Sequence, residues 1–233
     1  FHAVVHLADP FSNIPISPDS QDQFAFTWNG QQYTFQVLPP GYLHSGTICH
    51  GLVAQDLQAW QHYGQDFGVH LFHYVGDVLI TGTQDAVEKT LPLLCTYLKE
   101  RGWEVNQEKL QSPAREVEFL GIIWSGPVRR IPQKVLNTIE GFTTPMNKKD
   151  AQSFAGLMGF WQEFVPHLGL ILRPIHDVVR KKTVFHWGPE QKQAFAEAKA
   201  AIKQHQALGT LDTSLPFGLE TTEESNIATW SLW

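Results

Sequence analysis

The chain has 233 residues, 42% of them hydrophobic, which is enough to bury a core and more than one small domain usually holds. Its formal net charge of −6 excludes nucleic-acid binding that relies on overall positive charge. No apolar run reaches the roughly 18 residues of a membrane-spanning helix, and no charged-then-apolar leader is present. We therefore expect two or three globular lobes, with neither a membrane span nor a secretory signal.

The two cysteines, Cys49 and Cys95, lie in apolar surroundings and lack the CxxC spacing of a zinc site. This usage favours buried free thiols in a reducing, intracellular compartment, either cytoplasmic or nuclear. Because the first residue is Phe1 and not methionine, we also expect the sequence to be a piece of a longer protein.

Short strand-like runs dominate the first 124 residues. Between them, helices are predicted over 45–61 and 85–101. In the second helix, apolar residues recur at helical spacing, Pro92 should introduce a bend, and Gly102 is placed to end it. The strand-like runs are AVVHL, FAFTW, YTFQVL, VHLFHYV, DVLITG and VEFLGIIW, with a turn at Asn29-Gly30. Antiparallel hairpins with helices packed on one side indicate an α+β fold.

The second half of the chain changes character after a boundary at 127–145 that is rich in proline, glycine and basic residues. Asn147 is a good N-cap for a helix whose apolar stripe continues to Val165. A further helix is predicted over 189–204, and a strand over 215–221. Basic residues cluster in this half, which favours local contact with phosphate in spite of the negative net charge. They are Arg129, Arg130, Lys134, Lys148, Lys149, Arg173, Arg180, Lys181 and Lys182.

The stretch HYVGDVLITG, residues 73–82, reads as strand, tight turn and strand, with Asp77 at the turn. Polynucleotide polymerases present carboxylates on such a hairpin to two magnesium ions. Bridging two ions generally takes at least two carboxylates from different strands, and this turn supplies one.

Several blocks of sequence, in order and at matching spacing, resemble the reverse transcriptase of retroviral Pol, of the endogenous, murine leukaemia virus-like type. They are FAFTW, LPPGYLHSGTICH, YVGDVLIT, LKERGWEVNQEKLQ, VEFLGIIWSG, FAGLMGFWQEFVPHL and FHWGPEQKQAFAEAK. The resemblance implies partial fingers and a palm over 1–125, a thumb over 126–185, and the truncated start of an RNase-H-like connection domain over 186–233.

Carrying over the family's catalytic positions shows two of its three acids replaced. The YxDD motif falls on Tyr74 to Asp77, so its first aspartate is Gly76, and the aspartate of the earlier DLxxAF-like motif falls on His6. Asp77 is the one retained acid, and it is the remaining candidate ligand for the Mg²⁺ or Mn²⁺ that the family uses. A neutral imidazole at His6 is a poor magnesium ligand but accepts zinc or manganese. Asp9 should point to the opposite strand face from His6.

The resemblance also implies substrate contacts. Tyr74, Phe11, Pro40 and Lys109 fall where relatives meet the deoxynucleoside triphosphate, with Pro40 replacing a glutamine and Phe11 matching the residue that screens the ribose 2′-hydroxyl. Phe119, Gly121 and Trp124 resemble the primer-grip hairpin. Lys148, Lys149, Gly156 and Trp161 fall on the thumb helix that follows the minor groove of an RNA–DNA or DNA duplex. Plain packing is the alternative reading for each.

The remaining polar residues indicate no further metal site. His70 and His73 should point to opposite faces of a strand, while His44, His50 and His62 lack ligand partners, so we expect surface or hydrogen-bonded histidines. Thr221 and Thr222 stand near the position of a nuclease aspartate, which argues against RNase H activity, and Glu220, Glu223 and Glu224 read as exposed charges.

From these residues we expect an RNA-directed DNA polymerase family fragment that does not polymerise. Two alternatives stay open at this point. One is a non-catalytic module, retained by its host, that binds nucleic acid or protein. The other is a remnant without a selected function.

Overall fold

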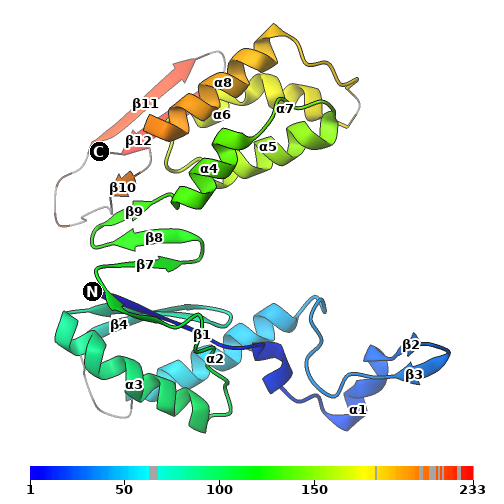
Figure 1. Ribbon diagram of the computed structural model, residues 1–233, viewed down its shortest axis with the longest axis vertical. Helices are drawn as coiled ribbons and strands as arrows, with labels where there is room; N and C mark the ends of the chain where they lie inside the picture. Colours follow the sequence, from blue (N-terminus) through cyan, green and yellow to red (C-terminus); the bar gives the residue numbers. More distant parts are fainter. Residues whose placement is uncertain are drawn as a thin grey trace. The chain divides into compact units, whose positions relative to one another are not determined.

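The computed structural model describes residues 1–62, 68–181, 183–204, 207–209, 214, 216, 218–224 and 227–232. Helices and sheets alternate along the chain, which confirms the α+β fold (Figure 1). The chain divides into two compact units, Phe1–Leu120 and Gly121–Trp233.

The first unit is built on a four-stranded antiparallel sheet in the order β4-β5-β1-β6. Its strands are β1 (His2–His6), β4 (Val69–Tyr74), β5 (Asp77–Gly82) and β6 (Gln111–Ala114). β5 pairs with β4 along the hairpin and with β1 on its other side, so β5 and β1 are the two central strands. The register between β1 and β6 shifts between His2 and Val4.

Two helices, α2 (Ser45–His62) and α3 (Gln84–Glu100), pack on one face of this sheet (Figure 1). Alternate strand residues, Ala3 and Val5 on β1 and Val78 and Ile80 on β5, are buried in one core with both helices. The side-chain period of two sends the residues between them, including His6 and Asp77, to the opposite face. The core therefore fixes which side of the sheet carries the hairpin carboxylate.

The segment between β1 and α2 consists of short elements. They are η1 (Pro10–Asn13), α1 (Pro18–Gln21), η2 (Asp22–Phe24), β2 (Phe26–Trp28) and β3 (Gln31–Tyr33). The β2–β3 hairpin turns at Asn29 and Gly30, which both have positive φ, as the sequence predicts. On one of its faces Phe26 stacks on Tyr33, and all residues of both strands are exposed. The unit ends with β7 (Glu116–Phe119), whose Val117 and Phe119 are buried.

The second unit combines small sheets with a helical core. Strands β8 (Ile122–Ser125), β9 (Val128–Arg130) and β10 (Ala207–Gly209) pair antiparallel, as do β11 (Leu219–Glu224) and β12 (Ile227–Leu232). The helices are α4 (Gln133–Gly141), α5 (Lys148–Phe160), α6 (Leu168–Ile171), α7 (Arg173–Val179) and α8 (Pro189–Gln204). Among the described residues, none of the helices combines the length and the hydropathy needed to cross a membrane.

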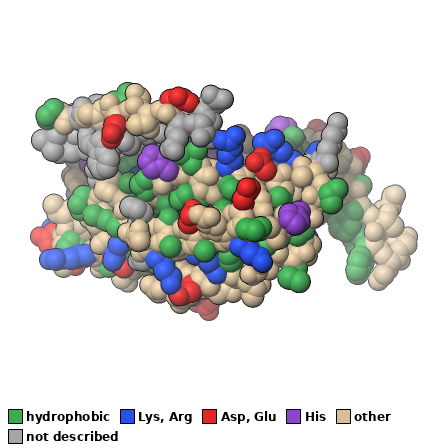
Figure 2. Space-filling model, turned by 90° about the horizontal axis from the view of Figure 1, so that it is seen from above, with side chains coloured by type: hydrophobic (Ala, Val, Ile, Leu, Met, Phe, Trp, Pro, Cys, Tyr) green, Lys and Arg blue, Asp and Glu red, His purple; other side chains and the backbone are tan. Residues whose placement is uncertain are grey.

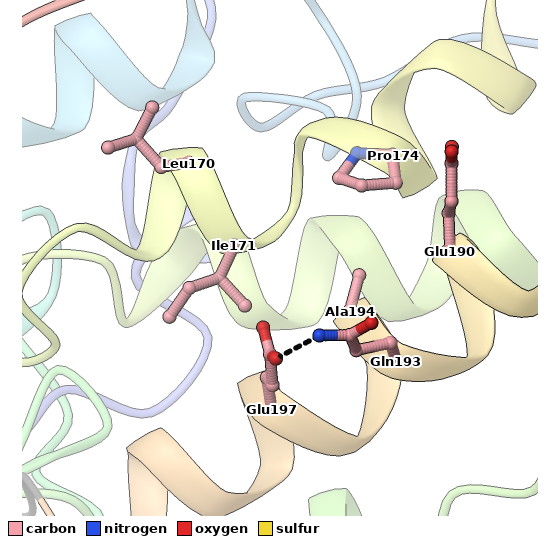
Figure 3. A pocket seen from close by; sticks show the side chains of 7 residues that line it. All are labelled: Leu170, Ile171, Pro174, Glu190, Gln193, Ala194 and Glu197. Atoms are coloured by element: carbon pink, nitrogen blue, oxygen red, sulfur yellow. Dashed lines mark hydrogen bonds between the residues drawn. The ribbon is translucent and has the colours of Figure 1, made fainter. Parts of the chain in front are cut away.

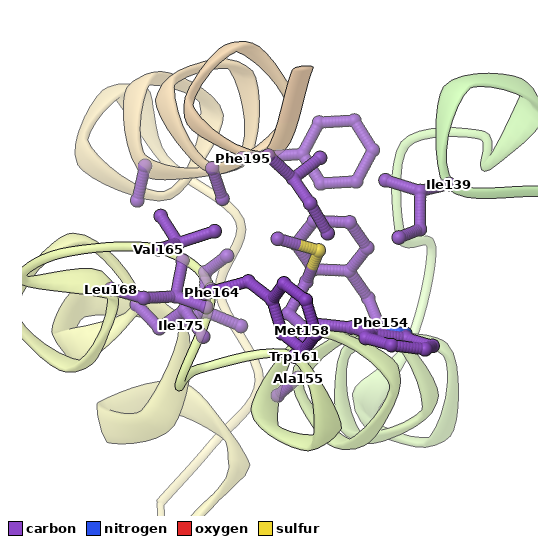
Figure 4. Packing of buried hydrophobic residues seen from close by; sticks show 14 of the residues in the cluster. Ile139, Phe154, Ala155, Met158, Trp161, Phe164, Val165, Leu168, Ile175 and Phe195 are labelled. Atoms are coloured by element: carbon purple, nitrogen blue, oxygen red, sulfur yellow. The ribbon is translucent and has the colours of Figure 1, made fainter. Parts of the chain in front are cut away.

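A single buried cluster joins all five of these helices (Figure 4). Phe154 and Met158 of α5 meet Ile139 of α4 and Phe195 of α8, and the rings of Phe154 and Phe195 lie 4.5 Å apart. Trp161, Phe164 and Val165 are buried in the same cluster although α5 ends at Phe160. The apolar stripe that runs to Val165 is therefore core, but its last part lies in turns that follow the helix.

Most helix boundaries agree with the sequence predictions. The side chain of Asn147 accepts a hydrogen bond from the Asp150 amide and so caps α5, and Gly102 follows α3 with a φ of 90°. α3 continues through Pro92 to Glu100. The predicted boundary at 127–145 contains regular structure, namely β9 and α4, and the run VEFLGIIW is broken into two strands at Leu120 and Gly121, which both have positive φ.

Candidate active site

The β4–β5 hairpin places Asp77 at the start of β5, directly opposite Tyr74 at the end of β4. Val75 and Gly76 form the turn, and Val75 adopts a φ of 54°, which is uncommon for a β-branched residue. The Gly76 carbonyl accepts a 2.8 Å hydrogen bond from the Leu7 amide. The turn is thus tied to the chain that leaves β1.

His6 and Asp77 are neighbours across the two central strands, because β1 and β5 pair His6 with Asp77. The His6 Nδ1 and Asp77 Oδ1 atoms lie 2.6 Å apart, which is a short side-chain hydrogen bond and an ion pair when the imidazole is protonated. Both side chains are partly exposed, at 22% and 35%. Two positions that the resemblance aligns with acids of the family are therefore close in space, and at one of them an imidazole is hydrogen-bonded to the carboxylate at the other.

Gly76 lies in a position that has no room for a side chain. A Cβ atom built there would approach the Pro10 Cγ atom to 2.9 Å and the Leu7 Cβ atom to 3.5 Å. The nearer contact is shorter than real Cβ atoms show, and the proline ring that makes it belongs to η1. Pro10 therefore packs against the turn at the position that the resemblance aligns with a family aspartate.

Asp9 lies outside β1, which ends at His6, so the alternation of strand faces does not apply to it. Its backbone is left-handed, with a φ of 40°, and its carboxylate accepts a 2.5 Å hydrogen bond from the Ser12 hydroxyl. Within the described residues, no group of three His, Cys, Asp or Glu side chains could hold a metal ion. One carboxylate paired with an imidazole does not fit a site for two magnesium ions.

The other residues predicted near a nucleotide are dispersed over several elements. Tyr74 is exposed beside Asp77, Phe11 is half-buried in η1, and Pro40 is exposed in the loop before α2. Lys109 is exposed in the loop after α3, where its amide donates to the Asn106 side chain. Of these four residues, only Tyr74 is placed next to Asp77 by strand pairing.

Three residues with the predicted primer-grip role fall at the division between the units. Phe119 is buried at the end of β7 in the first unit. In the second unit, Gly121 has a φ of 75°, and Trp124 on β8 is half-buried under the guanidinium of Arg129, 5.9 Å from the ring centroid. Each role stays a prediction.

The residues of α5 and its C-cap that are predicted to contact nucleic acid differ in burial. Trp161 is only 3% exposed and belongs to the core, so packing explains this residue. Lys148 is half-buried, and its Nζ donates to the Arg180 and Thr183 carbonyls. Lys149 and Gly156 are exposed, and no atom lies within 4 Å of a Cβ built at Gly156.

Sequence reasoning missed the residue next to Trp161. Phe160 is 62% exposed and lies one turn beyond Gly156, on the same helix face. Gln152 and Ser153 are also exposed and continue this face toward Lys149. A helical wheel started at Gly156 would have pointed to Phe160, since a step of four residues returns to the same side.

Charge is distributed unevenly between the two units. The first carries five Lys and Arg against thirteen Asp and Glu, and has no Lys or Arg before Lys89. The second carries twelve Lys and Arg against ten Asp and Glu. The face drawn in Figure 2 shows basic side chains interspersed with acidic and hydrophobic ones. The charge of the second unit therefore favours contact with phosphate more than the charge of the first unit does.

A surface hollow of about 230 Å³ lies between α8 and the α6–α7 segment (Figure 3). Leu170, Ile171 and Pro174 line one side, and Glu190 and Glu197 stand on α8 at the other. The Gln193 amide donates a 2.8 Å hydrogen bond to Glu197. None of the residues predicted from the sequence to act on substrate lines this hollow.

Comparisons with known proteins extend over both units. A family model described as reverse transcriptase (RNA-dependent DNA polymerase) matches residues 3–124. The Gag-Pol polyprotein of baboon endogenous virus (strain M7) is 30% identical over 235 residues, which cover 98% of this chain and 14% of the polyprotein. The Gag-Pol polyprotein of walleye dermal sarcoma virus is 30% identical over 230 residues, covering 97% of this chain and 13% of the polyprotein.

Solved structures of foamy viral protease-reverse transcriptase share the fold. One in complex with an RNA/DNA hybrid has a TM-score of 0.87 at 26% identity, covering 100% of this chain and 31% of that one. Another, in complex with double-stranded DNA, has a TM-score of 0.85 at 25% identity, covering 100% and 40%. The chain thus spans less than a quarter of these curated relatives and less than half of these solved neighbours.

Proposed function

Since this chain belongs to the reverse transcriptase family, we propose that it is a retroviral-type polymerase fragment that does not catalyse DNA synthesis. The observation that carries this proposal is the 2.6 Å contact between His6 Nδ1 and Asp77 Oδ1. Family members use divalent metals, and phosphoryl transfer by two metals requires carboxylates that hold both ions. Here one carboxylate remains, and it is already paired.

The size of the expected defect follows from what the missing acids would supply. Metal ions and their ligands stabilise the charge that develops on the attacking and leaving oxygens, and this term is usually the largest part of the rate enhancement. Loss of a single preorganised electrostatic group already costs about 10²–10³ in kcat. Pro40 adds to the defect, since proline lacks both the backbone N–H and the amide side chain that relatives have at this position.

Primer extension tests this proposal. The purified chain is given a primed RNA template and deoxynucleoside triphosphates, first with Mg²⁺ and then with Mn²⁺, beside an Asp77→Asn variant. No extension above that variant is the expected result. Extension that depends on Asp77 would show that a working metal site forms and would overturn the proposal.

Duplex binding is a second candidate function, supported by the exposed face of α5. Lys149, Gln152, Ser153, Gly156 and Phe160 share this face, which offers a cation, two hydrogen-bonding side chains, a glycine that permits close approach and a ring for apolar contact. The foamy viral neighbours were solved on an RNA/DNA hybrid and on double-stranded DNA. We infer that this chain binds such duplexes weakly through the exposed face of α5.

Affinity for a labelled RNA–DNA duplex, measured by fluorescence anisotropy over a range of salt concentrations, tests the binding. Lys149→Ala should weaken binding and reduce the slope of log K against log salt by about 0.9, the value for one phosphate contact on a B-form duplex. Phe160→Ala should weaken binding without changing that slope. Lys192→Ala, at an exposed position of α8, is the matched control. Equal affinity of all four proteins would exclude the α5 face.

Family membership also supports a domain assignment. We assign the first unit to partial fingers and palm, and α4 to α7 to a thumb. The sequence predicts that α8, in the segment 186–233, lies at the start of a connection domain. However, α8 buries Ala194, Phe195 and Ala198 in the same core as α4 to α7. This packing favours counting α8 with the thumb, so that the connection domain begins after it.

A further inference from the structure

Two histidines meet beneath the hairpin turn of the candidate active site. His50 on α2 and His73 on β4 stack face to face, with ring centroids 4.3 Å apart and planes inclined by 13°. The Val75 amide, in the turn itself, donates a 3.2 Å hydrogen bond to His50 Nδ1. Neither residue belongs to the catalytic positions described above.

The hydrogen bond from Val75 requires an acceptor at Nδ1 of His50. Because an amide N–H can only donate, Nδ1 must carry a lone pair, and the neutral ring must hold its proton on Nε2. A protonated His50 would present an N–H to the N–H of Val75 and would lose the bond. The left-handed Val75 would then keep its strained backbone without this hydrogen bond from the turn to α2.

His73 adds to this requirement for neutral rings. Its Nε2 atom is buried and has no hydrogen-bond partner, so a proton placed there would lack an acceptor. Burial, and then the charge of the neighbouring His50, lower the pKa of His73 below its ordinary value, and they outweigh a hydrogen bond with the His50 backbone that acts in the opposite direction. Two imidazolium rings stacked at this distance would also repel each other.

The groups around the pair offer no compensating negative charge. On β4, the neighbouring Tyr74, whose ring lies 6.3 Å from that of His50, carries a phenol and not a carboxylate. The acid of α2, Asp56, is bonded to Arg101 and Trp103.

The same holds for the other elements that pack against α2 and β4. η1 packs on α2, and the Asp9 that precedes it is bonded to Ser12. α3 packs on α2 and β4 and places the half-buried Cys95 thiol in the same core. β5 carries Asp77, which is paired with His6. Among the described residues, no Asp or Glu forms an ion pair with His50 or His73.

We propose that His50 is a positioning residue that holds the Tyr74–Asp77 turn in place only while the stacked imidazoles of His50 and His73 are neutral. Acidification then releases Val75 from α2 and loosens the turn that carries Asp77. The proposal does not depend on catalysis, because it concerns the backbone of the turn.

The sign of the pH effect on stability follows from His73. Since the pKa of His73 is lower in the folded chain than its ordinary value of 6.5, the unfolded chain takes up this proton first as the pH falls. The stability that the neutral ring contributes is therefore complete above pH 6.5 and is lost as the pH falls through the lowered pKa.

Amide hydrogen exchange of Val75, followed by NMR and expressed as a protection factor, tests the proposal directly. Between about pH 8 and about pH 5, protection should fall roughly threefold to tenfold, as expected for one lost hydrogen bond. His50→Gln keeps an acceptor that does not titrate, so its protection should stay constant over this range. His70→Gln, at an exposed position of the same strand, should behave like the unmodified chain.

Two results would overturn the proposal. One is an equal fall in Val75 protection in the unmodified chain and in His50→Gln, which would separate the effect from this imidazole. The other is a ¹⁵N spectrum of the unmodified chain near pH 8 in which His50 carries its proton on Nδ1. The second measurement requires no substitution, so it stands even if a variant fails to fold.

Discussion

At the scale of single residues, the Pro10 ring leaves no room for a side chain at Gly76 in the turn of the candidate active site. The resemblance aligns Gly76 with an aspartate of the family, but only the structure shows the proline ring that fills the space. The contact depends on how η1 returns toward the turn, and no local pattern encodes this path. Similarly, His6 and Asp77 could be predicted as candidates, whereas their 2.6 Å contact follows from the register of β1 and β5.

A pair of glycine substitutions tests this packing. Gly76→Ala adds one Cβ atom 2.9 Å from the Pro10 ring, and we expect it to lower the free energy of unfolding by about 1–3 kcal/mol, the usual cost of overpacking. Gly51→Ala, in α2 with nothing within 4 Å of the added atom, should raise it by roughly 0.5–1 kcal/mol through helix propensity. Urea denaturation measures both, and a neutral Gly76→Ala would show that Pro10 yields at little cost.

At the scale of elements, Asp56 joins α2 to α3. Its carboxylate accepts hydrogen bonds from Arg101 Nε at 2.9 Å and from Trp103 Nε1 at 2.7 Å, and its carbonyl accepts one from the Tyr97 hydroxyl at 3.0 Å. The two helices and their spacing could be predicted from apolar periodicity. The hydrogen bonds of Asp56 could not be predicted, because its partners are 41 to 47 positions away and polar side chains show no periodic pattern in the sequence.

Replacing this carboxylate should loosen the helix pair. Asp56→Ala leaves the Trp103 indole N–H, in a largely buried residue, without its acceptor, and we expect a loss of about 1–3 kcal/mol in the free energy of unfolding. Glu100→Ala, an exposed acid near the end of α3, is the control and should change stability by less than about 0.5 kcal/mol. Similar losses in both variants would mean that general charge, and not the joint, is responsible.

At the scale of the whole molecule, the two units have separate cores. The buried cluster around α2 and α3 and the cluster around α4 to α8 share no residue. Composition and length predict more than one lobe, and the change from strands to helices predicts roughly where the division falls. That α8 packs into the same core as α4 to α7 could not be predicted, because a helical stripe shows that a face is buried but not which core receives it.

Phe195 offers a test of this separation. Phe195→Ala removes a ring packed against Phe154 and Trp187, and we expect a loss of about 3–5 kcal/mol in the second unit, with unchanged stability of the first. Val184→Ala, at a position that is 87% exposed, should have no effect. Hydrogen exchange resolved by segment distinguishes the units, and an equal loss of protection in both would show that they unfold together.

The aromatic β2–β3 hairpin has a practical consequence for proteolysis. All residues of its two strands are exposed, and Trp28 is 65% exposed, so local opening should be inexpensive. Trypsin, which cuts after lysine and arginine, has no site before Lys89 and therefore cannot cut the opened hairpin. Chymotrypsin, which cuts after aromatic residues, has Phe26, Trp28 and Tyr33 within reach. The hairpin would therefore be the first place where the two proteases give different fragments of the folded chain.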